Sequence, residues 1–328
     1  MIIVGVDGGA TATKCIAVDE QGDLIGFGRG GPSNHVHGKK GLYRLKRALS
    51  TVFHETFRGK APQKADSVCL GMTGVRKGTQ GARVVETVVR VMLNAAHIYV
   101  CDDLEIALFG ATLGQSGVLV YSGTGSHTVA MDNSGKMISV GGWGYLIDDE
   151  GSGYDIGRQA LKWAFRSQDG RGKPTVLVEK LQDHFRCSSL TEVRTKIYEN
   201  DGLPRPEVAA LARLVAEAAA EGDEVAREIL AAAGRALAEM AIVAMRRLNK
   251  DFLLPVYPAG GVFQAGKWVL DPFVQVLKQT APNIEVRMPA FPPVVGAIII
   301  AMRIAGIPPT QSFFENLSTR LKEIDWVT

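Results

Sequence analysis

Residues 2–27 have the sequence IIVGVDGGATATKCIAVDEQGDLIGF, and residues 118–140 have the sequence VLVYSGTGSHTVAMDNSGKMISV. These two stretches decide the fold, because each passes from an apolar run through a Gly/Thr loop to a second strand, a polar turn and a third strand. A shift of 113 residues superposes equivalent positions: Thr11 on Thr124, Asp19 on Asp132, Gly22 on Gly135 and Ile25 on Ile138. The phased repetition predicts one supersecondary unit that occurs twice.

Helices and further strands are predicted after each copy of this unit. Helical spacing covers residues 42–57, 82–93, 206–221, 224–248, 268–279 and 294–305, and short apolar strands cover 67–72, 98–100, 253–257 and 284–287. This alternation, with antiparallel hairpins, predicts an α/β fold with mixed sheets. We expect two domains, 1–115 and 116–328, with the option that the last helix returns to the first domain.

The composition of the chain mainly shows which classes of function are improbable. A chain of 328 residues is longer than one core usually serves, and 46% hydrophobic with 22% charged residues is ordinary globular composition. The net charge of +3 is spread along the chain, which argues against a nucleic-acid partner. No apolar stretch reaches the roughly 18 residues of a membrane span, and no secretory signal is recognisable, so we expect a cytoplasmic protein without a membrane partner.

The four cysteines and the helices bear on metals and assembly. Cys15, Cys69, Cys101 and Cys187 stand far apart without a CxxC spacing, which favours small buried side chains in a reducing compartment over a metal framework. A homodimer is one option, because Ala-rich residues 231–244 can present an apolar helix face to a second subunit. Core packing explains the same face equally well.

The two Gly/Thr loops have a chemical use. Backbone N–H groups of such turns form an anion-binding concavity, so two loops on two domains could hold one polyphosphate. Asp7 ends the first strand and can bind Mg²⁺ through water, since Mg²⁺ retains waters and uses few carboxylates. Lys14 or the Thr11 hydroxyl could contact phosphate oxygens.

The motifs resemble a known superfamily. DGGATATK at residues 7–14 resembles the first phosphate loop of the sugar kinase/heat-shock-70/actin superfamily, SGTGS at 122–126 the second, and AGGVF at 259–263 its adenosine loop. More narrowly, SNH at 33–35, Asp103, and GGWG at 141–144 followed by DEGS at 149–152 resemble the N-acetylglucosamine kinase branch, grouped with BadF-type ATPases. The resemblance implies duplicated ribonuclease H-like, actin-like ATPase domains with ATP in the interdomain cleft.

The resemblance also implies roles for individual residues. Asp103 would be the base that takes the proton of the acceptor hydroxyl, although Asp102 is a rival and either aspartate could cap the following helix. The phosphates and adenosine of ATP would contact Gly8, Gly9, Thr11, Lys14, Gly123, Thr124, Gly125, Gly260 and Gly261. The sugar would contact Asn34, Thr73, Gly74, Asp103, Gly142, Trp143 and Asp149.

Some positions depart from the family pattern or stay open. The family more often has DGGGT where this chain has DGGAT at residues 7–11, so Ala10 replaces a glycine and adds a methyl group to a tight phosphate turn. Arg76 and Lys77 could contact a charged substituent of the substrate or simply face solvent. Glu150 ranks below Asp149 because it could stabilise its own loop. His35 and His37 lack metal-ligand companions and are interpreted as structural.

These features lead to one principal hypothesis and two alternatives. The principal one is an ATP- and Mg²⁺-dependent kinase of the 6-hydroxyl of N-acetylglucosamine or a related amino sugar, with glucosamine, N-acetylmuramic acid or a hexose as other acceptors. The second is a BadF-type ATPase activator of a 2-hydroxyacyl-CoA dehydratase, which would hold an iron–sulfur cluster between subunits through paired cysteines. The third is a sugar-binding regulator without turnover.

Overall fold

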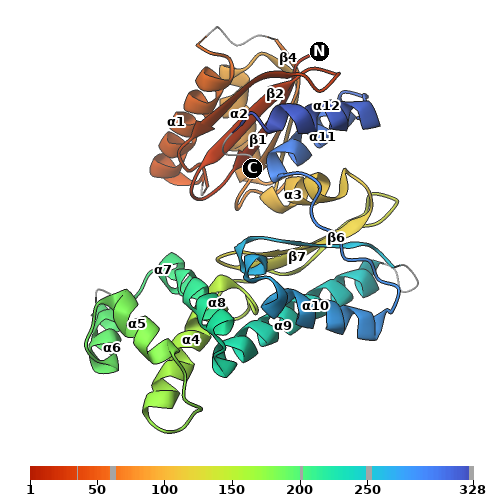
Figure 1. Ribbon diagram of the computed structural model, residues 1–328. Helices are drawn as coiled ribbons and strands as arrows, with labels where there is room; N and C mark the ends of the chain where they lie inside the picture. Colours follow the sequence, from red (N-terminus) through yellow and green to blue (C-terminus); the bar gives the residue numbers. More distant parts are fainter. Residues whose placement is uncertain (35, 60–63, 200–201, 249–252, 325–328) are drawn as a thin grey trace. The chain divides into compact units, whose positions relative to one another are not determined.

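The computed structural model describes residues 1–34, 36–59, 64–199, 202–248 and 253–324. It divides the chain into two compact units: unit 1 comprises Met1–Gln115 with Pro289–Thr328, and unit 2 comprises Ser116–Met288 (Figure 1). The expected second domain extended to residue 328. Instead, both C-terminal helices, α11 (Pro293–Ile304) and α12 (Gln311–Leu321), belong to unit 1.

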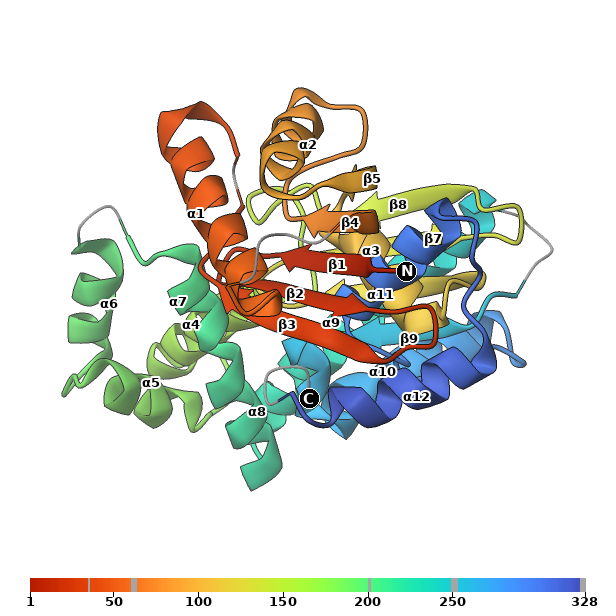
Figure 2. The same cartoon turned by 90° about the horizontal axis from the view of Figure 1, so that it is seen from above.

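Unit 1 is built on a five-stranded mixed sheet of order β3-β2-β1-β4-β5. The hairpin strands are antiparallel, whereas β4 and β5 extend the other side of β1 in parallel. Helices α1 and α2 cover one face and α11 the other (Figures 1 and 2). Its elements are β1 (Ile3–Gly8), β2 (Thr13–Val18), β3 (Leu24–Gly30), α1 (Gly38–Thr56), β4 (Ala65–Met72), α2 (Gln80–Met92), β5 (Ala95–Cys101) and α3 (Asp103–Thr112), besides α11 and α12.

Close packing fixes α11 in unit 1. A Cβ atom on Gly296 of α11 would lie 1.8 Å from the main-chain oxygen of Ile106 in α3, so only glycine allows the two helices to approach this closely. A Cβ on Gly5 of β1 would lie 2.7 Å from the oxygen of Val294, at the start of the same helix. The C-terminal segment therefore completes the core of unit 1.

Unit 2 is built on a four-stranded sheet of order β8-β7-β6-β9, in which β6 and β9 are parallel. The long helix α9 packs against β6, β7 and β8 and against α10. Its elements are β6 (Gly117–Ser122), β7 (Ser126–Met131), β8 (Met137–Gly141), α4 (Gly153–Gln168), α5 (Leu177–Phe185), α6 (Leu190–Tyr198), α7 (Arg205–Ala210), α8 (Ala212–Glu221), α9 (Glu224–Leu248), β9 (Val256–Ala259), the 3-10 helix η2 (Gly261–Ala265) and α10 (Lys267–Thr280).

The predicted duplication is confirmed down to single hydrogen bonds in the turn between the second and third strands. In unit 1 the Asp19 side chain accepts from the N–H groups of Gln21 and Asp23, and in unit 2 Asp132 accepts from Ser134 and Lys136. Each turn then places a glycine at positive φ, +86° at Gly22 and +80° at Gly135. The same Asx turn therefore closes both hairpins.

The two copies differ by one residue in the Gly/Thr loop. Gly8 pairs with Thr13 across the first loop, which leaves four residues between them, whereas Ser122 pairs with Ser126 and leaves three. The shift of 113 residues therefore holds from the second strand onward, and the first strands align with a shift of 114. As a result, the pair Asp7–Lys14 in unit 1 corresponds to the pair Tyr121–His127 in unit 2.

Three sequence predictions differ from the structure in detail. The helix predicted over 206–221 is divided at Leu211, where the N–H of Leu211 bonds to the carbonyl of Val208, three residues back. That carbonyl packs directly on Gly157 of α4, which fixes the tight turn. The strand predicted over 284–287 is reduced to a single bridge between Val256 and Val286. Helices α4, α5, α6 and α12 were not predicted.

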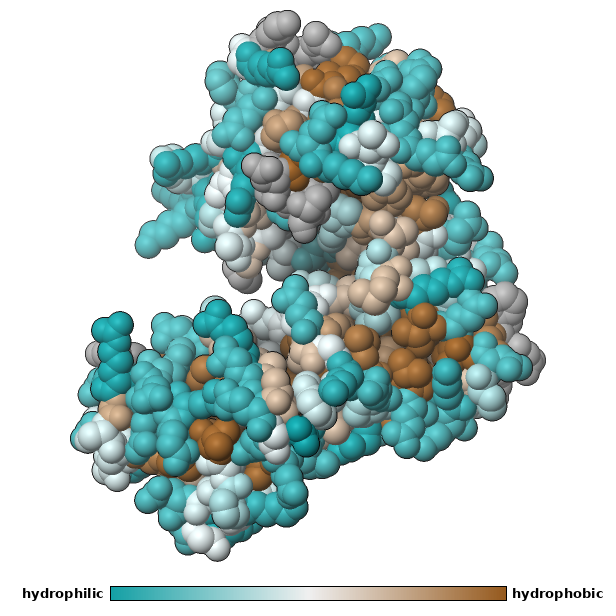
Figure 3. Space-filling model, in the orientation of Figure 1, coloured by the Kyte–Doolittle hydropathy of each residue, from teal (hydrophilic) through white to brown (hydrophobic). Residues whose placement is uncertain are grey.

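On the face shown in Figure 3, hydrophilic residues cover most of the surface, with smaller hydrophobic patches between them. Within the described residues, no helix combines the length and apolar character that crossing a membrane requires. Cys15, Cys69 and Cys101 are buried free thiols and Cys187 is half-buried, in line with their interpretation as packing residues.

Candidate active site

The first phosphate loop joins β1 to β2 and is fixed by main-chain hydrogen bonds. The N–H of Gly9 bonds to Ala12 within the loop at 3.0 Å, and the Gly9 carbonyl accepts from Ser33 at 3.2 Å. The Gly8 carbonyl accepts from the N–H of Thr73 at 2.9 Å, beyond the end of β4. A Cβ on Gly8 would lie 2.4 Å from the Met72 sulfur and 2.7 Å from the Ser33 hydroxyl, so a larger residue there would have to displace these side chains.

Residues 31–34 form a second loop at this edge of the sheet. The buried Thr13 hydroxyl bonds to the Gly31 carbonyl and to the Ser33 hydroxyl, both at 2.8 Å. The carbonyl of Asn34 accepts from the Arg44 guanidinium at 2.8 Å, and Asn34 itself is 8% exposed. The predicted sugar ligand Asn34 is therefore held beside the first phosphate loop. His35, its neighbour in the SNH motif, lies outside the described residues.

Asp103 and Thr73 come together at the ends of two neighbouring parallel strands. Gly71 of β4 is in register with Cys101 of β5, and the Thr73 hydroxyl donates to Oδ2 of Asp103 at 2.5 Å. Asp102 precedes Asp103 and is the N-cap of α3, because its Oδ1 accepts from the N–H of Leu104 at 3.0 Å. The favoured aspartate Asp103 thus bonds to Thr73 and its rival Asp102 caps the helix, while the two carboxyl groups also share a side-chain hydrogen bond.

Burial and mutual repulsion perturb the carboxylates at this edge. Burial raises the pKa of Asp7 to about 6, the charge of Asp103 adds to the increase, and Lys14 opposes it. Burial, again with the charge of Asp103, raises the pKa of Asp102 to about 7. Asp7 and Lys14 are direct neighbours in the β1–β2 register. Such perturbed carboxylates are a feature of functional sites.

The second phosphate loop joins β6 to β7 in unit 2 and is tied to the start of α4. The N–H of Gly153 bonds to the Gly123 carbonyl at 2.8 Å, and the hydroxyls of Ser122 and Ser126 bond to the carbonyls of Gly151 and Glu150, each at 2.8 Å. The loop therefore lies next to the N-terminus of a 16-residue helix, whose dipole favours negative charge. The carbonyl of Glu150 is part of this support, which gives that residue a structural role.

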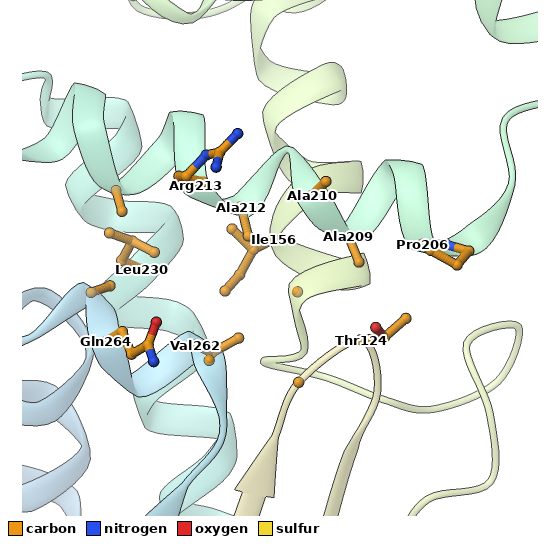
Figure 4. Close-up of a pocket in the computed structure, with 15 residues that line it drawn as sticks. Thr124, Ile156, Pro206, Ala209, Ala210, Ala212, Arg213, Leu230, Val262 and Gln264 are labelled. Carbon is orange, nitrogen blue, oxygen red and sulfur yellow. The ribbon is translucent and has the colours of Figure 1, made fainter. Parts of the chain in front are cut away.

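A cavity of about 610 Å³ in unit 2 unites the second phosphate loop with the predicted adenosine loop (Figure 4). Gly123 and Thr124 line it on one side and Gly261, with Val262 and Gln264 of η2, on the other. Gly260 has φ of +98°, and a Cβ there would lie 2.2 Å from the Ser122 carbonyl, so the adenosine loop packs on the end of β6. The cavity is also lined by Ile156, Leu230 and the alanines of α7 and α8, which makes it an apolar pocket of the kind that holds a ring system.

Asp149 has a partner that the sequence did not reveal. Its carboxylate is 3% exposed and forms an ion pair with Arg205 of α7, with 2.6 Å between Oδ2 and Nη2. A Cβ on Gly125 would lie 2.4 Å from Nη2 of Arg205 and 2.9 Å from Oδ2 of Asp149. The ion pair therefore packs against the second phosphate loop. Asp149 adopts a positive φ of +65°, which is unusual for a residue with a side chain.

The GGWG segment follows β8. Gly142 has φ of +75°, and a Cβ there would collide with the His127 ring at 2.4 Å. The N–H of Trp143 bonds to Oδ2 of Asp148 at 2.9 Å, while the Trp143 side chain is 76% exposed. The ring is therefore not a core residue of unit 2, and its contact with a sugar stays a prediction.

The predicted site residues thus fall into two groups, one in each unit. Asp7, Gly8, Gly9, Thr11, Lys14, Asn34, Thr73, Gly74 and Asp103 lie at one edge of the unit 1 sheet or in its loops. Gly123, Thr124, Gly125, Gly142, Trp143, Asp149, Gly260 and Gly261 lie in unit 2. Arg205 is the residue that sequence reasoning missed; its only signal is a basic residue at the start of a helix.

Comparisons with known proteins agree with the fold and the loops, which define an actin-like ATPase of the sugar kinase type. A solved structure from Chromobacterium violaceum, provisionally assigned as an N-acetylglucosamine kinase, is 29% identical with a TM-score of 0.72, covering 92% of this chain and 98% of the other. The chain also matches the model of the BadF/BadG/BcrA/BcrD ATPase family over residues 4–301. It belongs to this family.

Two curated relatives span almost the whole chain. The N-acetylmuramic acid/N-acetylglucosamine kinase of Clostridium acetobutylicum is 32% identical over 91% of this chain and 97% of its own length. The N-acetyl-D-glucosamine kinase of Dictyostelium discoideum is 27% identical over 92% of this chain and 98% of its own length.

The buried charge of Asp7 should cost stability. Because its pKa of about 6 in the folded chain exceeds the ordinary 3.8, the folded state binds the proton more tightly, and stability falls as pH rises between these values. In Mg²⁺-free buffer, Asp7→Asn should therefore raise the free energy of unfolding by up to about 3 kcal/mol at pH 7.5 and about half of that at pH 5.0. Denaturant titrations at both pH values measure it, with exposed Asp183→Asn as the control. If Asp7→Asn did not raise the free energy of unfolding at pH 7.5 above that of the Asp183→Asn control, the raised pKa of Asp7 would be contradicted.

The ion pair under the second loop should be needed for stability. Arg205→Ala leaves a nearly buried carboxylate without its cation and should lower the free energy of unfolding by about 1–3 kcal/mol at pH 7.5. The loss should be smaller at pH 5, since Asp149 can then take up a proton, as its pKa is already raised by burial. Arg213→Ala on α8, an exposed arginine 4.0 Å from Glu217, is the control and should change stability by less than about 0.5 kcal/mol. Equal losses in both variants would contradict a larger contribution of the Asp149–Arg205 ion pair to stability.

Proposed function

We propose that this protein transfers the γ-phosphoryl group of ATP to the 6-hydroxyl of N-acetylglucosamine or a closely related amino sugar. The observation that carries the proposal is the hydroxyl–carboxylate pair of Thr73 and Asp103, beside the first phosphate loop and Asp7. The family and the names of the relatives support the choice of an amino sugar.

Asp103 is the proposed general base. The Thr73 hydroxyl donates to Oδ2 of Asp103, and we assign Oδ1 to the acceptor hydroxyl. As the acceptor oxygen forms its bond to the γ-phosphorus, its proton passes to Asp103, the bond from phosphorus to the bridging oxygen breaks, and ADP leaves. The negative charge of Asp103 adds to the effect of burial in raising the pKa of nearby Asp7.

The phosphates are assigned to the two Gly/Thr loops. Gly8, Gly9 and Thr11, with the Lys14 ammonium, would hold one part of the triphosphate, and Gly123, Thr124 and Gly125 another. Gly260 and Gly261 would border the adenosine in the cavity of unit 2. Asp7 fits Mg²⁺ held through water, because a buried carboxylate whose pKa is raised gains most from a nearby cation. When bound, Mg²⁺ would neutralise charge on the phosphates.

The acceptor is assigned to polar groups near Asp103 and to the segment after β8. Asn34 follows Ser33, whose N–H bonds to the Gly9 carbonyl of the first phosphate loop. Gly74 follows Thr73, whose N–H bonds to the Gly8 carbonyl. Gly142, Trp143 and Asp149 are assigned to binding the acceptor sugar, as the resemblance implies. For Asp149, the ion pair with Arg205 leaves only one carboxylate oxygen for a sugar hydroxyl.

An ADP-release assay with ATP and Mg²⁺ tests the proposal. The acceptors are N-acetylglucosamine, glucosamine, N-acetylmuramic acid, N-acetylmannosamine and glucose, and 6-deoxy-N-acetylglucosamine tests the position. We expect turnover with N-acetylglucosamine and none with its 6-deoxy analogue. Absence of turnover with every amino sugar would refute the proposal, and a stoichiometric iron–sulfur cluster after anaerobic reconstitution would favour the dehydratase activator instead.

The aspartate pair offers a matched test of the base. Asp103→Asn keeps the size of the side chain and an acceptor for the Thr73 hydroxyl but cannot take a proton, so kcat should fall by about 10²- to 10⁴-fold. Asp102→Asn is the control, because asparagine caps a helix as well as aspartate and can still hydrogen-bond to Asp103, so kcat should fall far less than in Asp103→Asn. If Asp103→Asn retained the wild-type rate, or if Asp102→Asn fell as far, Asp103 would not be the base.

A further inference from the structure

The segment from Thr73 to Thr79 connects the proposed base to the start of α2. At one end the Thr73 hydroxyl bonds to Asp103. At the other, Thr79 is the N-cap of α2, and both its N–H and its hydroxyl bond to the Arg76 carbonyl, at 3.2 and 2.6 Å. The N–H of Val75 bonds to the Met72 carbonyl at 3.0 Å. The backbone of Arg76 is therefore fixed next to the acceptor end of the site.

The Arg76 guanidinium is not used by the fold. It is exposed, and it has no hydrogen bond or ion pair with any residue that the structure describes. The next residue contrasts with it, because the Lys77 ammonium lies 4.7 Å from the centre of the Tyr99 ring and its charge acts on Glu105. Hence the Lys77 ammonium packs on a ring of the fold, whereas the Arg76 guanidinium, among the described residues, makes no such contact and acts only through its charge on Asp102.

Two cations serve different parts of this edge. Lys14 is the neighbour of Asp7 at the phosphate loop. Arg76 acts on Asp102, on the side of the proposed base: it opposes the rise in the Asp102 pKa that burial and Asp103 cause. Lys14 stands at the phosphate loop, whereas the Arg76 charge acts on Asp102, the residue before the proposed base, so it is available to a substrate anion other than the phosphates.

We infer that Arg76 is a specificity-determining residue that binds a carboxylate substituent on the acceptor amino sugar. The inference rests on the proposed function and deepens it by naming the substrate class, an N-acetylated amino sugar that carries an ether-linked carboxylate. A guanidinium presents a planar pair of N–H donors that matches a carboxylate, and an uncharged sugar has no group that requires it. Because Arg76 is exposed, it loses little hydration before the anion binds.

The experiment compares two acceptors in matched variants. The ratio of kcat/KM for N-acetylmuramic acid to that for N-acetylglucosamine is measured in wild type, Arg76→Gln, Arg76→Lys and Arg83→Gln. Arg83 is an exposed arginine on α2 whose loss changes the net charge equally. The methyl ester of N-acetylmuramic acid supplies an acceptor of the same shape without the negative charge.

Arg76→Gln should lower the ratio about 10-fold through the carboxylated sugar alone, whereas Arg76→Lys should lower it less because the charge remains. Arg83→Gln should leave the ratio unchanged, and the methyl ester should not distinguish the variants. The inference is overturned by an unchanged ratio in Arg76→Gln, by an equal fall for both sugars with a raised KM for ATP, or by a wild-type enzyme that phosphorylates only N-acetylglucosamine. In all three cases the proposed kinase activity stands; absence of turnover with every sugar would refute that activity itself.

Discussion

Parallel pairing of β1 with β4, and of β4 with β5, brings the ends of three strands to one edge of the unit 1 sheet. In this register Asp7 lies beside Gly71, and Gly71 lies beside Cys101. The residues just beyond the strands are therefore neighbours, although Thr73 and Asp103 are 30 positions apart. The hydrogen bond from Thr73 to the Gly8 carbonyl then joins the candidate base to the phosphate loop. Without this register, none of the three groups would share a site.

Concentrating carboxylates at one edge has an electrostatic consequence. Burial, together with the negative charge of Asp103, raises the pKa values of both Asp7 and Asp102. A triphosphate would add more negative charge at the same place. In the proposed function, binding of the triphosphate therefore requires cations, and Lys14 and a magnesium ion near Asp7 would supply them. Because these carboxylates destabilise the folded protein when no cation is bound, cation binding at this edge should stabilise the fold.

Local signals in the sequence were sufficient for the duplicated unit and its loops. Asp19 and Asp132 determine their turns through hydrogen bonds to residues two and four positions ahead, so the pattern is visible in the sequence. The pair of Asp149 and Arg205 spans 56 positions and depends on how α7 packs, which no local pattern encodes. The division of the predicted helix at Leu211 likewise depends on Gly157 of another helix. The return of α11 to unit 1 was left open for the same reason.

The two copies of the unit share a scaffold but differ in the chemistry at their loops. At equivalent strand positions, unit 1 has the charged pair Asp7–Lys14 and unit 2 has Tyr121–His127. Unit 1 extends its sheet with two parallel strands whose ends supply Thr73 and Asp103, whereas the extension in unit 2 is β9, which leads into Gly260 and the cavity. A carboxylate base is therefore available at the loop of unit 1, and an apolar pocket at that of unit 2. This division is the reason that the proposed function assigns the reacting groups to unit 1 and the nucleotide to unit 2.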